Sequence, residues 1–220
     1  MKYIKLFEEF KIKPRATDVP VYSTGQRPIT SDNKKVTRKQ DIIVATDDNI
    51  KQIVRDEINR LGTDADLNHI NTSQVTDMHC LFMDTDFQGD VSQWDVSNVK
   101  DMSYMFIRCY NFNCDLSKWD VSNVTNMYAI FYECSNFNKD ISDWDVSKVK
   151  DMRDTFNGCT SFNQDISKWD IRSVRKMDSM FERCTNFNQD LSSWDARMVR
   201  TRGYMFIDCP IKKEFKPKFK

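Results

Sequence analysis

Large apolar residues recur along most of the chain at a constant interval. Trp, Val, Phe and Cys each return every 25 residues between positions 94 and 209. The four columns are Trp94, Trp119, Trp144, Trp169 and Trp194; Val99, Val124, Val149, Val174 and Val199; Phe106, Phe131, Phe156, Phe181 and Phe206; and Cys109, Cys134, Cys159, Cys184 and Cys209. A less regular unit begins near Leu67, where Ile70 replaces Trp. The period indicates a stack of similar coils, since one such unit is too short to bury its own apolar face.

Each unit contains two different hydrophobic patterns. Phe112 and Leu116 are four residues apart, and the polar residues Asp115 and Ser117 stand on either side of Leu116. This alternation of apolar and polar positions is typical of a strand. The second half of the unit has apolar residues spaced by three, four and three, as on one face of a helix: Val124, Met127, Phe131 and Cys134. We therefore predict an α/β solenoid of about six coils, with one parallel sheet and short helical turns opposite it.

The segments around the repeats differ from them in pattern and composition. Residues 42–44 favour a short strand, and residues 47–61 place apolar side chains on one helical face between Asp47 and Gly62. This strand and helix are predicted to cap the first coil. The expected organisation is a flexible basic leader and linker at 1–40, the cap at 41–66, the solenoid at 67–209 and a basic tail at 210–220.

Charge is balanced overall but unevenly distributed. The chain has 33 basic and 33 acidic side chains, so no global field points to nucleic acid or a membrane. Residues 1–40 have a net charge of +6 and residues 210–220 one of +4, which leaves −10 on residues 41–209. No apolar run reaches 18 residues, and the N-terminus has no secretory signal pattern. We expect no transmembrane segment, and a cytoplasmic or virion-associated location rather than secretion.

The repeat resembles the BspA-like repeats of bacterial surface proteins, which are relatives of leucine-rich repeats. The matching stretches are MFIRCYNFNCDLSKWDV at 105–121, WDVSNVTNM at 119–127 and FNGCTSFNQDISKWD at 156–170, and the resemblance extends over 67–209. It implies a leucine-rich-repeat-like solenoid that recognises proteins or surfaces and catalyses no reaction. The expected function is thus that of an adhesin-like protein-binding module.

The first ten residues suggest an alternative. MKYIKLFEEF resembles the short leaders of proteins packaged into, or built onto, the heads of large tailed phages. That resemblance implies a virion or head-associated structural component.

Two columns of Asp follow the repeat, and one of them belongs to the predicted binding site. The column that follows Trp, such as Asp120, is expected to accept backbone N–H groups in turns. The other is expected to point outward from the sheet with its neighbours. The predicted partner-binding residues are Asp115, Ser117, Lys118, Asp140, Ser142, Asp165, Ser167, Lys168, Asp190 and Ser192. Calcium binding by the Asp columns is a less favoured alternative, because no calcium-loop motif occurs.

Catalytic chemistry finds no support in the motifs. The two histidines, His69 and His79, lie in the irregular first unit, and no phosphate loop, dinucleotide fingerprint, zinc-protease motif or nucleophile elbow occurs. We predict no enzyme activity, cofactor or metal. The Cys and Trp columns are assigned to the core, and Cys114, outside its column, is expected to be the exposed thiol.

Basic residues gather in the later coils. They are Lys148, Lys150, Arg153, Arg172, Arg175, Lys176, Arg197, Arg200 and Arg202. The simplest interpretation is a solvated face. The alternative is binding of an anionic polymer, including nucleic acid, through this face and the basic arms.

Overall fold

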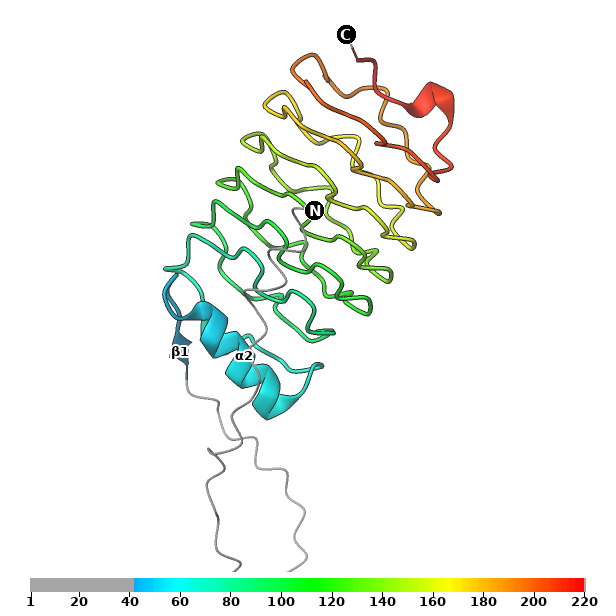
Figure 1. Cartoon of the computed structure of the whole chain (residues 1–220). Helices are drawn as coiled ribbons and strands as arrows, with labels where there is room; N and C mark the ends of the chain where they lie inside the picture. Colours follow the sequence, from blue (N-terminus) through cyan, green and yellow to red (C-terminus); the bar gives the residue numbers. More distant parts are fainter. Residues whose placement is uncertain (1–41, 220) are drawn as a thin grey trace, which may run out of the picture. The chain divides into compact units, whose positions relative to one another are not determined.

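The computed structural model describes residues 42–219. The predicted leader and its phage-like motif lie outside the described residues. Successive coils stack along one axis from the helix to the C-terminus (Figure 1). Regular secondary structure is sparse and consists of β1 (Ile43–Val44), α2 (Ile50–Leu61), β2 (Ile70–Asn71) and a 3-10 helix at Lys213–Phe215.

The predicted strand and helix before the repeats are confirmed. β1 pairs in parallel with β2, with Ile43 opposite Ile70. The helix α2 begins at Ile50 rather than at Asp47, because the Asp47 carboxylate instead accepts the backbone N–H groups of Thr76 (2.7 Å) and Asp77 (3.1 Å). The last residue of α2 is Leu61, and Gly62 caps the helix as predicted, with a φ of 98° that suits glycine.

Stacked rings form the core of the coils. The ring centroid of Phe131 lies 5.8 Å from that of Phe106 in the preceding coil, and the two ring planes differ by 4°. Its distance to the ring centroid of Phe137, in the same coil, is 4.0 Å. The five Trp side chains are only 3–4% exposed. Each indole N–H donates to a carbonyl of the preceding coil, as Trp144 does to Leu116 (3.0 Å). The Trp column is therefore core, as predicted.

The first four members of the Cys column are also core, whereas Cys209 is only partly buried. The thiol of Cys134 donates to the carbonyl of Phe106 at 2.9 Å, and Cys159 makes the equivalent bond to Phe131 at 2.9 Å. Burial holds the pKa of both thiols well above its ordinary range. The expectation that Cys114 is exposed is wrong. It is 9% exposed, and burial raises its pKa to about 12.

The predicted strand of each coil is absent. Residues 112–120 contain no strand. Instead, the backbone N–H of Trp119 donates to the carbonyl of Leu116 (3.1 Å) and closes a turn. Parallel bridges between the coils form a ladder at one position in each coil: Asp77, Asp101, Asn126, Asp151, Lys176 and Thr201. One further bridge, between Asp66 and Asp90, joins the segment after α2 to the first coils. The only sheet among the described residues is thus the short β1–β2 pair.

The predicted helical turns are replaced by a ladder of reverse turns. We call residues 127–133 and their equivalents in the other coils the turn ladder. Ala129 (φ 54°) and Glu133 (φ 57°) adopt the left-handed conformation in the turns, and Ile130 donates to Met127 O at 3.3 Å. Alternate N–H groups point out of the coil: Ala129 donates to Arg153 O in the next coil at 2.9 Å. Backbone bonding therefore runs between coils rather than along a helix.

Candidate functional site

The predicted site residues lie on a series of equivalent turns. Asp115 accepts the backbone N–H of Ser117 at 3.0 Å, and Asp140 accepts that of Ser142 at 2.9 Å. Asp165 with Ser167 and Asp190 with Ser192 repeat the contact, each at 2.9 Å. The four carboxylates are exposed, as are Lys118 and Lys168. Each Asp side chain thus has a structural task and remains accessible to solvent.

The carboxylates of this column influence one another. The N–H of Ser142 lowers the pKa of Asp140, while the neighbouring charges of Asp115 and Asp165 act in the opposite direction. Hydrogen bonding wins, and the pKa of Asp140 lies below its ordinary value. The structure therefore brings the predicted Asp residues together along the stack as a line of ionised groups.

The second Asp column caps turns, as predicted. Asp120 accepts the N–H of Ser122 at 3.0 Å. In the last two coils the equivalent Ser is Arg, and the Arg172 side chain donates to both oxygens of Asp170 (2.8 and 2.7 Å). Arg197 binds Asp195 in the same way and lowers its pKa to about 2.

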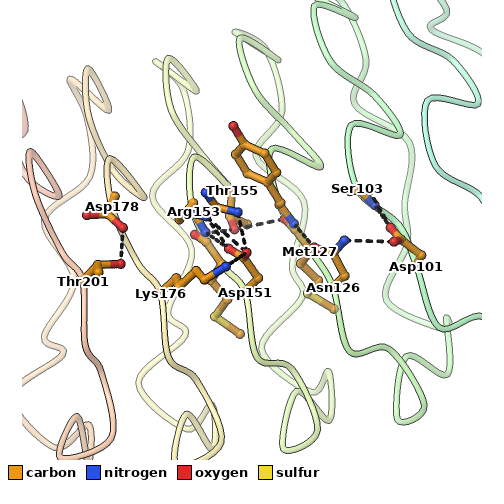
Figure 2. Close-up of polar contacts among 12 residues, drawn as sticks. Asp101, Ser103, Asn126, Met127, Asp151, Arg153, Thr155, Lys176, Asp178 and Thr201 are labelled. Atoms are coloured by element: carbon orange, nitrogen blue, oxygen red, sulfur yellow. Dashed lines mark hydrogen bonds and ion pairs between the residues drawn. The ribbon is translucent and has the colours of Figure 1, made fainter. Parts of the chain in front are cut away.

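Sequence reasoning missed a third polar column, which follows the parallel bridges. We call it the bridge column; its members are Asp77, Asp101, Asn126, Asp151, Lys176 and Thr201. Figure 2 shows its side chains from Asp101 to Thr201 lying in a line across successive coils. Because the residue type changes from coil to coil, no single motif marks this column. Its constant position between the Val and Met columns is the signal that would have found it.

Asp151 is the centre of the bridge column. It accepts three bonds from the Arg153 guanidinium, the shortest at 2.6 Å, and one from Lys176 at 3.3 Å. Burial raises the pKa of Asp151, but the Arg153 hydrogen bonds outweigh it and hold the pKa below its usual range. Arg153 in turn lies over the ring of Tyr128, 4.4 Å from its centre, and Tyr128 is 4.7 Å from Tyr104. The group thus joins four successive coils.

Next to the bridge column, the turn ladder carries the most varied residues of the repeat. We call these positions the variable face. In successive coils they are Ser103, Tyr128, Arg153, Asp178 and Gly203; Tyr104, Ala129, Asp154, Ser179 and Tyr204; and Ile107, Tyr132, Asn157, Glu182 and Ile207. The side chains of Ser103, Ile107, Ala129 and Asn157 are buried, and the other members are partly or fully exposed. Between these positions, the core position of Phe131 is Phe in every coil, and that of Met127 is Met in every coil except the last, where it is Arg202. The backbone is therefore repetitive while this surface is not.

Long side chains connect neighbouring coils across the variable face. The guanidinium of Arg183 donates to Asn157 Oδ1 at 3.0 Å, Glu133 Oε1 at 3.2 Å and the Tyr132 hydroxyl at 3.3 Å. Tyr132 and Arg183 lie two coils apart, so one side chain ties three coils together. Tyrosine and arginine held on a rigid backbone are the residue types that dominate protein-binding surfaces.

Two further observations concern the described residues. Within 42–219 no three His, Cys, Asp or Glu side chains converge in a way that would hold a metal ion. No helix in this part of the chain is long and apolar enough to cross a bilayer.

Comparison with known proteins identifies one family. The model of the family described as "Mycoplasma protein of unknown function, DUF285" matches residues 49–153 and again 115–216. The two matches together span the cap helix and all the repeats. No curated protein and no solved structure matches the chain.

Proposed function

The chain belongs to the DUF285 family of Mycoplasma proteins, and we propose that it is a non-enzymatic module that binds a protein partner through its rigid repeat surface. We also propose the finer relationship, to BspA-like surface repeats of the leucine-rich-repeat type. The aromatic core with its 25-residue period and the recurrent WDVSNV-type segment support this relationship. Stacked coils of this kind offer a preformed surface, so a partner binds without ordering the backbone.

The observation that carries the proposal is the contrast between a constant core and the variable face. Phe131 and its equivalents keep one residue type in every coil, whereas Tyr128, Arg153 and Asp178 occupy a single column. A surface made only of identical units would present the same group at every step. The change from coil to coil gives the face one distinguishable centre, at the Tyr104, Tyr128 and Arg153 cluster.

The exposed Asp and Ser residues on the other turns stay the rival location for the contact. Their carboxylates are solvent-accessible and ionised, so a partner can reach them. Each also holds its own turn through a hydrogen bond, as Asp115 does with Ser117. That structural task accounts for the repetition of Asp without requiring a partner.

Affinity capture from the source organism's lysate tests the proposal with three baits. The first is the intact chain. The second carries Tyr104→Ala and Tyr128→Ala on the variable face. The third carries Asp115→Asn, Asp140→Asn and Asp165→Asn, which remove charge but keep an acceptor for each turn. We expect a protein to be captured by the first and third baits and lost by the second.

The reverse pattern would place recognition on the Asp column. Equal capture by all three baits would exclude both surfaces, and capture of no protein by the intact chain would contradict the proposed function. Thermal unfolding of each bait, monitored by circular dichroism, separates a lost contact from a lost fold.

A further inference from the structure

A column of residues beside the bridge column becomes basic in the later coils. Its members are Lys100, Thr125, Lys150, Arg175 and Arg200. Their backbones are in direct register: Arg175 donates its N–H to Lys150 O at 2.9 Å, and Arg200 donates to Arg175 O at 2.7 Å. Backbones paired in this way are about 4.8 Å apart. Lys150, Arg175 and Arg200, which we call the cation column, therefore follow one another coil by coil.

The charge of this edge changes sign along the stack. Residues 95–101 hold two Asp and one Lys, a net of −1, whereas residues 170–176 hold one Asp and three cations, a net of +2. Several of the later cations are neutralised: Arg172 by Asp170, Arg197 by Asp195, and Lys176 by Asp151. Within the described part of the chain, the cation column has no carboxylate at ion-pair distance. Within residues 42–219, five of the nine basic residues of the later coils have no such partner, namely Lys148, Lys150, Arg175, Arg200 and Arg202. The cation column contains the three of them that share one position of the repeat.

The acidic residues near the cation column limit how long a bound anionic ligand can be. The repeat-bearing region, 41–209, has a net charge of −10, and the same edge carries Asp101 and Asp77 in the earlier coils. A long polyanion laid along the stack would pass from the cation column onto these carboxylates and be repelled. A short acidic peptide avoids them. Same-face side chains of an extended peptide are about 6.7 Å apart, so two or three carboxylates match the length of the column.

We propose that Lys150, Arg175 and Arg200 form a docking strip for a short acidic segment of a protein, laid along the stack axis. The proposal rests on the proposed protein-binding function and adds the chemistry of the partner. The strip lies beside the bridge column, so one partner can contact the strip and the variable face together.

Binding of a fluorescein-labelled hexaglutamate peptide, followed by fluorescence anisotropy at low ionic strength, tests the strip. The test variant is Lys150→Gln with Arg200→Gln. Arg175 is left in place because its guanidinium also donates to the carbonyls of Ser173 (2.6 Å) and Val174 (3.3 Å). The matched control, Lys118→Gln with Lys168→Gln, removes the same charge from exposed lysines on the Asp115-type turns. The basic arms are identical in all three proteins.

We expect the test variant to bind the peptide roughly tenfold more weakly than the intact chain, and the control to stay within about twofold. Failure of the intact chain to bind, or an equal loss in the control, would overturn the strip. Tighter binding of a 20-residue oligothymidylate than of the peptide, lost in the same variant, would overturn the acidic-peptide assignment in favour of nucleic acid.

The two proposals can fail separately. The Tyr104→Ala and Tyr128→Ala bait should bind hexaglutamate as the intact chain does, because both tyrosines lie outside the strip. If the strip fails while that bait still loses its captured protein, recognition by the variable face stands. If the strip binds but no protein is captured, the acidic-segment site stands alone.

Discussion

The two ends of the stack are closed in different ways. At the N-terminal end, α2 packs Ile50 and Val54 onto the first coil, and Glu57 bonds His69 at 2.8 Å. At the C-terminal end the chain after Cys209 crosses the last coil, and Phe215 O accepts the N–H of Leu191 at 2.8 Å. Lys216 lies over the ring of Phe206, 5.1 Å from its centre.

Burial shows what this difference means for the core. The last coil exposes Tyr204 by 74%, Ile207 by 48% and Met198 by 47%, and Val199 and Phe206 are only partly buried. A helix covers a coil end with a continuous apolar face, whereas an extended tail covers it with a few side chains. The extent to which an end coil is shielded from solvent therefore depends on the apolar area that the cap presents, and backbone pairing alone does not provide it.

The largest expected difference between the ends is in amide hydrogen exchange. The N–H of Ser179 donates to Gly203 O in the next coil at 2.8 Å, whereas the equivalent N–H of Tyr204 finds no backbone acceptor within residues 42–219. We expect an opening free energy close to that of global unfolding, about 5 kcal/mol or more, for Ser179 and near zero for Tyr204. Exchange monitored by NMR measures both. Equal protection would mean that something else covers the last turn ladder.

The next largest difference is expected in the free energy of unfolding when a Phe ring is removed from the middle or from the end of the Phe column. Phe131→Ala should lower the free energy of unfolding by about 3–5 kcal/mol, since Phe131 is fully buried between two other rings. Phe206→Ala should cost about half as much, because only the preceding coil stacks on that ring. Urea unfolding gives both values. Similar losses would show that the tail seals the last coil as well as a coil does.

A smaller effect is expected at the N-terminal cap. Ile50→Ala should destabilise by about 2–4 kcal/mol, because Ile50 is fully buried beneath α2. Ile207→Ala, at the exposed end, is the matched control and should change the free energy of unfolding by less than about 0.5 kcal/mol. Urea unfolding again applies. An effect of Ile207→Ala as large as that of Ile50→Ala would contradict the contrast between the ends.

The tie between the start of the cap and the first repeats is weaker still. Asp47→Ala removes the acceptor for the N–H groups of Thr76 and Asp77 and should cost about 1 kcal/mol. Asp47→Asn keeps one acceptor oxygen and should recover most of that loss. Thermal unfolding of the two variants side by side distinguishes the hydrogen bond from the charge.

The smallest effect concerns pH. Hydrogen bonds from Arg60, opposed by burial and assisted by His69, hold the pKa of Glu57 below its ordinary 4.5. A carboxyl whose pKa is lower in the folded state stabilises the fold above the unfolded pKa and loses that contribution as pH falls through the folded pKa. The stability difference between the intact chain and Glu57→Gln should therefore shrink below about pH 4.5. A difference that does not change between pH 7 and pH 3 would argue against ionised Glu57 as a stabilising group.

Much of the core could be predicted from the sequence, because a single apolar type at a fixed interval leaves few alternatives. The Trp, Phe and Cys columns and the cap helix follow from that interval. The local backbone could not. Left-handed residues such as Ala129 and Glu133 recur every four positions in the turn ladder, so the ladder places Met127 and Phe131 inward with the spacing of a helix. Apolar spacing alone does not separate these structures.

The candidate site was harder to predict for a related reason. The repeated Asp residues attract attention because they recur, yet in Asp115 and its equivalents the recurrence follows from a turn hydrogen bond. The bridge column and the variable face carry changing residues, and changing residues leave no motif. Cys114 was misplaced because its position is Gly, Cys, Lys, Gln and Gln in successive coils, which is typical of a surface site. The shorter Cys side chain instead lies against the preceding coil, with its sulfur 3.5 Å from both Asp90 Oδ1 and the backbone nitrogen of Val91.

The Cys thiol-to-carbonyl hydrogen bonds, the Phe ring stacks and the backbone hydrogen bonds of the turn ladder recur from one coil to the next, so the coils are added at a constant spacing along the stack. Removing residues 119–143, one whole period, would place the next Trp, Phe and Cys against the same neighbours as before. The first step of the stack has 24 residues and keeps its columns aligned, since Phe82 still stacks on Phe106 with ring centroids 5.2 Å apart, so a loop can absorb a difference of one residue. A deletion of about half a period would instead place unlike residues against one another. The length of the stack can therefore change only in steps of one coil, about 4.8 Å each, and each step would shift every surface group beyond it by that amount.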